Sequence, residues 1–119
     1  MEHHIKHFYG ELIRGVTELL TSTVTHIKKT AIDILASLSR FKELRRTIFS
    51  TLVNKFGDSD MEVVNEVSKC LKKQFYEDIQ ASETLLEEAE AFLFREHVSQ
   101  KSQFFIINFL NNVNLKFYS

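Results

Sequence analysis

The stretch "FGDSDMEVVNEVSKCL", residues 56–71, joins a turn to an amphipathic helix and decides the fold. Its first five residues combine a glycine with two aspartates and a serine, which favour turns. Apolar residues then return every fourth position, as Val63, Val67 and Leu71, which is typical of one buried helical face. The segment therefore predicts an aspartate-rich turn between two antiparallel helices.

The apolar pattern of residues 63, 67 and 71 has counterparts elsewhere in the chain. The pattern at residues 27, 31 and 35 precedes it by 36 positions, and the pattern at 101, 105 and 109 follows it by 38, with Lys101 in the first place. A helix-pair period of this length indicates an α-solenoid, slightly shorter than the ~40–47 residues of HEAT and armadillo units. A six-helix bundle would also show amphipathic helices, so the repetition favours the solenoid.

Hydrophobic spacing predicts six helices, at about 5–20, 24–38, 42–56, 60–75, 82–95 and 100–116. Gly57 is expected to end the third helix in a left-handed conformation. Ser59 and Glu62 have the spacing of a capping box, and Ser99 is the expected cap of the last helix. The fold class is thus all-α, a single domain (1–119) of three HEAT- or armadillo-like helix pairs, with repeats at about 5–38, 42–76 and 79–116.

The second predicted helix carries one apolar stripe. We expect that stripe to be buried through its members Val24, Ile27, Ala31, Ile34, Leu35 and Leu38.

Composition supports a helical fold and excludes several protein classes. The chain has no proline and three glycines, whereas strand-rich folds need many more turn residues. Its one cysteine, Cys70, excludes an internal disulfide and any multi-cysteine metal site. No run approaches the ~20 apolar residues of a membrane span, and the N-terminus lacks the apolar core of a secretory signal. We therefore expect no membrane association and a reducing compartment.

Residue patterns that would indicate catalysis are weak. Glu87, Glu88 and Glu90 fit a solvated acidic helix face, and the chain has no glycine-rich phosphate loop or nucleophile motif. His3 and His7 have a helical spacing that can hold a metal, but the cluster with His4 lacks an identifiable further ligand. We expect no enzyme activity, no cofactor, no metal site and no small-molecule substrate.

Charge is unevenly distributed along a chain whose net charge is −1. Residues 22–57 hold seven Lys/Arg against two acids, whereas residues 77–96 hold seven acids and one arginine. Equivalent positions of consecutive solenoid repeats align, so these cations could form a stripe that follows a phosphate backbone. Solvated helix faces are the simpler alternative. The candidate nucleic-acid-binding residues of this segment are Lys28, Lys29, Arg45, Arg46 and Lys55.

The last predicted helix carries more apolar surface than an outer helix normally buries. Six of the seven residues in "FFIINFL", residues 104–110, are apolar. Phe104 and Ile107 widen this surface beyond the ~100° arc that typically faces a core. A terminal solenoid helix should present a polar outer face if it caps the array. We therefore expect a protein partner or further repeats to contact Phe104, Ile107 and Asn111.

The segment "LVNKFGD" at 52–58 and a second block within residues 88–111 together resemble the CCAAT-binding-factor and nucleolar-complex family of ribosome assembly proteins. The first, "LVNKFGD" at 52–58, is similar to the family turn "LVNK-x-GD". The second comprises "EAE" at 88–90, "LFR" at 93–95, "VSQKSQFF" at 98–105 and "FLN" at 109–111, and residues 8–31 resemble the preceding helix pair more loosely. The chain lacks the family's His-Pro turn after the helix around residues 63–73. Family members are also several times longer, so the chain would be one piece of a longer protein or a reduced member.

This resemblance implies a nuclear and nucleolar scaffold without catalysis. Family members assemble the large (60S) ribosomal subunit, pair with a second nucleolar-complex protein and contact precursor rRNA, and some are associated with CCAAT elements. The motif residues carried over by position are Asn54, Lys55, Arg95, Ser99, Gln103 and Phe104. Arg95 joins the candidate nucleic-acid-binding residues, although its guanidinium would equally suit a carboxylate within the fold.

Two other functions fit the same residues. One is a cytoplasmic HEAT-type adaptor, for example in transport, and the other is a nucleic-acid-binding module that uses the basic 28–55 face.

Overall fold

The computed structural model describes residues 2–95 and 97–118, with side chains described between residues 7 and 113. Every regular element that the structure describes over this range is a helix, which confirms the all-α prediction. None of the described helices is both long and apolar enough to cross a membrane. The elements are α1 (Glu2–Leu19), α2 (Thr25–Leu38), α3 (Lys42–Asn54), a 3₁₀ turn η1 (Lys55–Gly57), α4 (Met61–Glu77), α5 (Ile79–Leu93) and α6 (Gln100–Tyr118).

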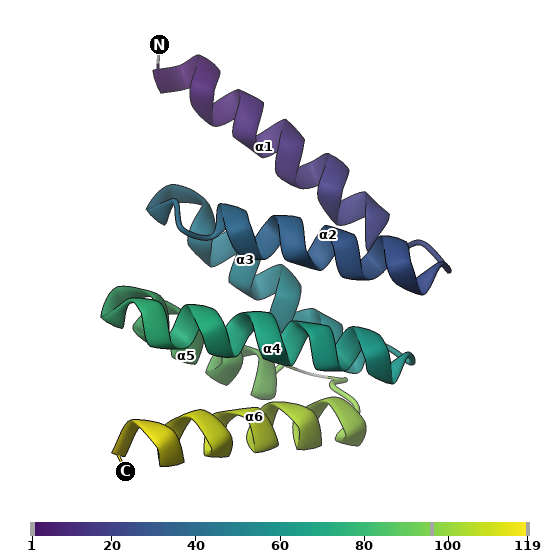
Figure 1. The fold of residues 1–119 in the computed structure, drawn as a ribbon, viewed down its shortest axis with the longest axis vertical. Coiled ribbons are helices and arrows are strands. Elements are labelled where there is room, and N and C mark those ends of the chain that lie inside the picture. Colours follow the sequence, from purple (N-terminus) through teal and green to yellow (C-terminus); the bar gives the residue numbers. More distant parts are fainter. Residues whose placement is uncertain (1, 96, 119) are drawn as a thin grey trace.

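The helices form two stacked layers. Figure 1 shows α2, α4 and α6 one below another in front, α3 and α5 behind them, and α1 at the top. Each helix runs back against the one before it, so α1–α2, α3–α4 and α5–α6 are antiparallel pairs. The most extensive contacts join α3 to α5 and α2 to α4, which are equivalent helices of neighbouring pairs. The predicted α-solenoid is thus confirmed, whereas the repeat borders at 38/42 and 76/79 stay a prediction.

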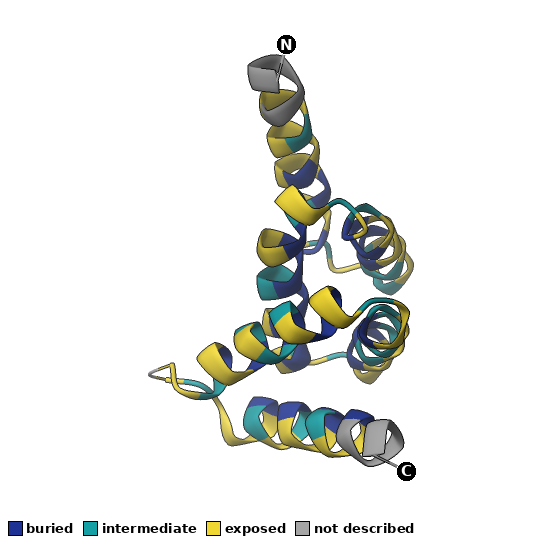
Figure 2. Ribbon diagram, turned by 90° about the vertical axis from the view of Figure 1, so that its left-hand side faces the viewer, coloured by how far each residue is buried: buried dark blue, intermediate teal, exposed yellow. Residues whose placement is uncertain are grey.

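The apolar core lies between the two layers, where buried residues line the inner side of each helix (Figure 2). Val63, Val67 and Leu71 of α4 are each 0% exposed, as their four-residue spacing predicts. Phe49 of α3 and Leu85 of α5 are also fully buried. Each such side chain contributes about 1.5–3 kcal/mol relative to an exposed one, so this inner stripe stabilises the helix stack.

α2 is rotated relative to its predicted buried stripe. Its buried residues are Ala31, Ile32, Leu35 and Ala36, whereas Val24, Ile27 and Ile34 are 50%, 38% and 39% exposed. α2 contacts α3 as well as α1 and α4, and these contacts turn the side of Ile32 and Ala36 inward. Only part of the predicted stripe is therefore core.

Aspartates begin α4 and α5, which corrects two predicted helix starts. The Asp60 carboxylate, rather than the Ser59 hydroxyl, accepts the N–H of Glu62 at 3.0 Å and caps α4. Asp78 caps α5 by accepting the N–H of Gln80 at 2.9 Å, so this helix begins at Ile79 and not near residue 82. In both cases a carboxylate satisfies a free N–H of the first helical turn.

Two expectations at the ends of α3 and α6 have opposite outcomes. Ser99 is confirmed as an N-terminal cap, because its Oγ accepts the N–H of Ser102 at 3.1 Å. The left-handed conformation predicted for Gly57 is wrong, since no described glycine has a positive φ. Gly57 instead closes η1, and a Cβ at this position would lie 2.6 Å from the Oγ of Ser102.

Candidate functional site

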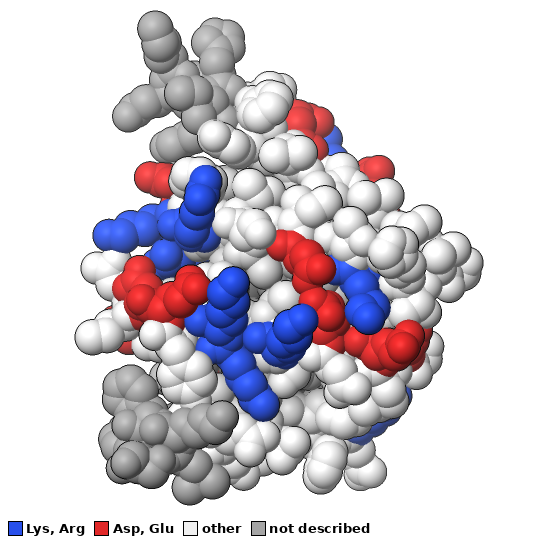
Figure 3. Space-filling model, viewed as in Figure 1, with Lys and Arg blue, Asp and Glu red and all other residues white. Residues whose placement is uncertain are grey.

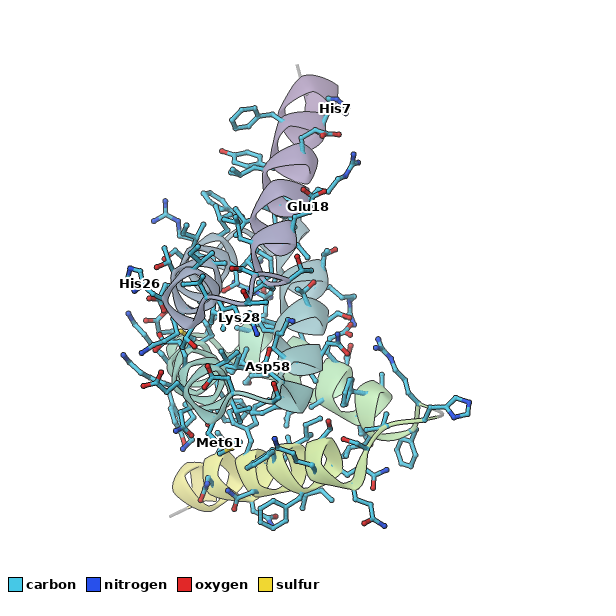
Figure 4. The ribbon with its side chains drawn as sticks, turned by 90° about the vertical axis from the view of Figure 1, so that its right-hand side faces the viewer. His7, Glu18, His26, Lys28, Asp58 and Met61 are labelled. Carbon is cyan, nitrogen blue, oxygen red and sulfur yellow. The ribbon has the colours of Figure 1, made fainter. Side chains whose placement is uncertain are left out.

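The turn at residues 55–60, hereafter the Asp58 turn, connects all three helix pairs. From the first pair, Lys28 Nζ donates to the Asp58 carboxylate at 3.1 and 3.4 Å, and Figure 4 shows the two side chains side by side. Lys55 Nζ donates to the Leu20 carbonyl at 3.2 Å. From the third pair, Lys101 Nζ donates to the Asp58 carbonyl at 3.4 Å. The first family block is thus the point where the loops of the three pairs meet.

The Asp58 turn is held by ionised carboxylates. The Asp58 side chain is only 6% exposed, and this burial alone would raise its pKa. The N–H of Asp60 at 2.9 Å and the ammonium of Lys28 outweigh the burial and hold the pKa of Asp58 below its ordinary value. The hydroxyl of Thr25 donates to the Asp60 carboxylate and lowers the pKa of that group as well. Both aspartates therefore stay negatively charged in the turn.

Beside the Asp58 turn lies an open pocket of about 580 Å³ in which the two family blocks meet; we call it the inter-block pocket. Four of the six family-motif residues line it, namely Asn54, Lys55, Arg95 and Ser99. The remaining lining residues are Gly57, Asp58, Phe92, His97, Val98 and Ser102. Because the blocks lie far apart in the sequence, no local pattern indicated that they share a pocket.

The far wall of the inter-block pocket combines a cation, hydroxyls and an unusual backbone. The guanidinium of Arg95 is exposed and lies 5.5 Å from the centre of the Phe92 ring. The hydroxyls of Ser99 and Ser102 are 2.8 Å apart. His97 has a φ of 67°, a left-handed backbone conformation that is uncommon for residues other than glycine. Residues in such conformations are often found at functional sites. This wall offers mainly hydrogen-bond donors and positive charge.

Arg45 and Arg46, predicted as part of a basic face, both form contacts between helices of this chain. Arg45 is buried; its Nε donates to a backbone carbonyl at 2.9 Å and a terminal nitrogen lies 3.4 Å from the Asp78 carboxylate. Arg46 forms ion pairs with Glu87 at 2.8 Å and Glu88 at 3.1 Å. These contacts connect α3 to the acidic α5.

The continuous basic face expected across residues 28–55 does not form. Lys28 and Lys55 belong to the Asp58 turn, whereas Arg45 and Arg46 lie on the α3–α5 side. Figure 3 shows cationic and acidic side chains interleaved on the face of α2 and α4. The fold places an acid opposite most of these cations, which interrupts the stripe. Whether Lys29 or any of the others contacts nucleic acid stays a prediction.

α6 exposes the apolar residues predicted to bind a partner. Phe104 is 64% and Ile107 48% exposed, while Ile106 and Phe109 on the opposite side are buried. Asn111 is also exposed. The surplus apolar surface is therefore on the outside of the stack, and its use by a partner stays a prediction.

Sequence reasoning missed a cluster of Asp33, Glu66 and Cys70 between α2 and α4. The Cys70 Sγ lies 3.4 Å from Asp33 and 3.6 Å from Glu66, and the three potential ligand atoms lie within 4.8 Å of one another. Burial and the carboxylates raise the pKa of Cys70 to about 12, and the hydrogen bond with Asp33 raises the pKa of Glu66. The Cys70 thiol therefore keeps its proton at neutral pH, and the cluster carries no metal assignment. Of the histidines considered for a metal, His7 is exposed, and the side chains of residues 3 and 4 lie outside the described range.

Stacked antiparallel helix pairs place the chain in the class of α-solenoid helical-repeat proteins. A crystal structure of an engineered protein from the Northeast Structural Genomics Consortium has the same fold, with a TM-score of 0.51. It is 21% identical in sequence, and the match covers 85% of this chain and 44% of that one. This likeness concerns the fold alone.

Curated relatives match nearly the whole chain, although no family model matches it. Human CCAAT/enhancer-binding protein zeta is 28% identical over 115 residues, covering 96% of this chain and 11% of the relative. Nucleolar complex protein 1 of Drosophila melanogaster is 26% identical over 113 residues, covering 94% and 10%. Protein SLOW WALKER 2 of Arabidopsis thaliana is 24% identical over 112 residues, covering 93% and 11%. The predicted resemblance to the CCAAT-binding-factor and nucleolar-complex family is thus confirmed, and the chain spans about a tenth of the length of these relatives.

Proposed function

We propose that this chain is a non-catalytic helical-repeat scaffold in the assembly of the large (60S) ribosomal subunit, acting in the nucleus and nucleolus. The observation that carries the proposal is the match of 94% of the chain to a relative named for a nucleolar complex. The architecture supports it, because stacked helix pairs present extended surfaces suited to binding other macromolecules. The ligands proposed for this scaffold are a second nucleolar-complex assembly protein, pre-60S particles and their rRNA.

The outer face of α6 is the proposed contact for the second assembly protein. Phe104, Ile107 and Asn111 follow one another at spacings of three and four residues, so they share one side of the helix. Burying an apolar side chain of this size contributes about 1.5–3 kcal/mol, which makes the first two residues suitable anchors. An exposed helix face of this kind fits an apolar groove or a facing helix of the partner.

Affinity purification of the tagged chain from its source cells tests the proposal. We expect pre-ribosomal assembly factors to be recovered with the unchanged chain and lost with Phe104→Asp and Ile107→Asp. The matched control is Ile79→Asp, which places the same charge on a side chain of α5 that is 71% exposed.

Three results would contradict the proposal. Recovery of vesicle or karyopherin components instead of assembly factors would favour the cytoplasmic adaptor. Equal loss of partners with Ile79→Asp would show that α6 is not the contact. Loss of helicity in the Phe104 and Ile107 variants, measured by circular dichroism, would show that the surface belongs to the core.

A further inference from the structure

The near wall of the inter-block pocket is positively charged where a ligand can reach it. Lys55 uses part of its ammonium for the Leu20 carbonyl and keeps further N–H donors. Its distance to the Asp58 carboxylate is 3.8 Å, too long for a strong pair. The Asp58 carboxylate itself is 6% exposed and is held by Lys28 at 3.1 Å, so its charge is already compensated. An approaching ligand therefore meets a cation on this wall and little free negative charge.

The opposite wall adds a second cation and the start of a long helix. Arg95 is exposed, and among the described residues it forms no ion pair. Ser99 and Ser102 stand at the N-terminus of α6, whose partial positive charge also favours anions. Two cations, the hydroxyl of the exposed Ser99 and the exposed amide of Asn54 thus surround one pocket, a set of groups that matches the oxygens of a phosphate.

An exposed aromatic ring lies next to these phosphate-binding groups in the sequence. Phe94, directly before Arg95, is 82% exposed, more than any other large apolar side chain that the structure describes. Figure 2 shows the α5–α6 connection, in which this residue lies, projecting from the body of the stack. Aromatic rings beside arginine bind unpaired bases by stacking, whereas a duplex keeps its base faces covered.

We infer that the inter-block pocket binds a backbone phosphate of single-stranded nucleic acid through Arg95 and Lys55, with an adjacent base stacked on Phe94. Within the proposed function this nucleic acid is RNA, so the inference refines that function and rests on it. The contact is local, one phosphate and one base, and needs no continuous basic face.

Fluorescence anisotropy with the purified 119-residue chain and a labelled twelve-nucleotide oligouridine RNA tests the inference. Arg95→Gln and Phe94→Ala should each weaken binding about tenfold. Arg95→Gln, which removes the phosphate contact, should also reduce the slope of log affinity against log salt concentration by about one. Phe94→Ala, which removes the stacked ring, should leave this slope unchanged. The matched control is Arg14→Gln on α1, a 68% exposed arginine outside the pocket, which should preserve both affinity and slope. Both Arg95 and Phe94 are exposed, so circular dichroism should show an unchanged fold.

Several outcomes would overturn the inference. They are the absence of RNA binding, an equal loss with Arg14→Gln, and an unchanged salt slope with Arg95→Gln. Binding to a polyglutamate peptide but not to the RNA would show that the pocket takes an acidic protein segment instead. RNA binding by the purified chain does not depend on an assembly partner. If the chain does not bind RNA but still recovers assembly factors in the affinity purification, RNA binding by the pocket is refuted and the scaffold function is not. If the chain binds RNA but recovers no assembly factors, the scaffold function is refuted.

Discussion

Substituting Gly57 by alanine tests the close contact between the Asp58 turn and α6. A Cβ on residue 57 would lie 2.6 Å from the Oγ of Ser102 and 3.9 Å from its Cβ. The first distance is well inside van der Waals contact, so the Ser102 hydroxyl has to move. Ser102 is 4% exposed, and its Oγ is 2.8 Å from that of Ser99, so the movement disturbs a partly buried hydrogen bond.

The size of the effect follows from two opposing contributions. Overpacking a tight site costs about 1–3 kcal/mol. Gly57 does not have a positive φ, so alanine fits the backbone and gains about 0.4–1 kcal/mol by restricting the unfolded chain. We expect Gly57→Ala to lower the free energy of unfolding by about 1–2 kcal/mol in urea titrations.

A double-mutant cycle with Ser102→Ala separates the contact from any general effect of the substitution. Once the hydroxyl is gone, the nearest atom to the new Cβ is the Ser102 Cβ at 3.9 Å, an ordinary contact. In this background Gly57→Ala should be neutral or stabilise by up to about 1 kcal/mol. The coupling energy should then be about 1–3 kcal/mol. An equal loss of stability in both backgrounds would refute the contact as its cause.

Two further predictions concern ionisable groups. The folded pKa of Asp58 lies below its unfolded value of about 4, so its stabilisation is present above that value and is lost as the pH falls through the folded pKa. The urea midpoint of the unchanged chain should therefore fall more on acidification than the midpoint of Asp58→Asn. Equal falls in the two proteins would contradict the stabilisation by Asp58. The pKa of Cys70, about 12, leaves little thiolate at neutral pH. Alkylation by iodoacetamide should be at least ~100-fold slower than in the urea-unfolded chain, and equal rates would disprove the shielding.

The sequence predicts the helices well because their apolar spacing and the core have the same physical cause. Val63, Val67 and Leu71 repeat every four residues and are all fully buried. Ser99 caps α6 because the hydroxyl of a serine directly before a helix can accept a free N–H of the first helical turn, here that of Ser102. Both predictions depend on a single helix and its own turn.

The failures occur where another helix decides the outcome. The burial of Ile32 on α2 depends on contacts with three neighbouring helices, which the pattern of one helix does not contain. Asp60 begins α4 in place of Ser59 because Asp58, held by Lys28 of α2, accepts the N–H of Asp60. The inter-block pocket likewise requires α6 to return beside η1, so its residue set could not be assembled from local spacing.

The opposite charges of residues 22–57 and 77–96 are better explained by packing than by steering of a ligand. α3 carries Arg45 and Arg46, and its most extensive contacts are with α5, which begins after Asp78 and carries Glu87. The pair between Arg46 and Glu87 is about 60% exposed on both sides, and such exposed pairs contribute only about 0–1 kcal/mol each. Their main effect is therefore to align α3 on α5 rather than to stabilise the stack. Cations paired with acids of the same chain attract external anions only weakly. External ligands are therefore expected at Arg95, which keeps an unpaired charge among the described residues, and on α6, which keeps exposed apolar side chains.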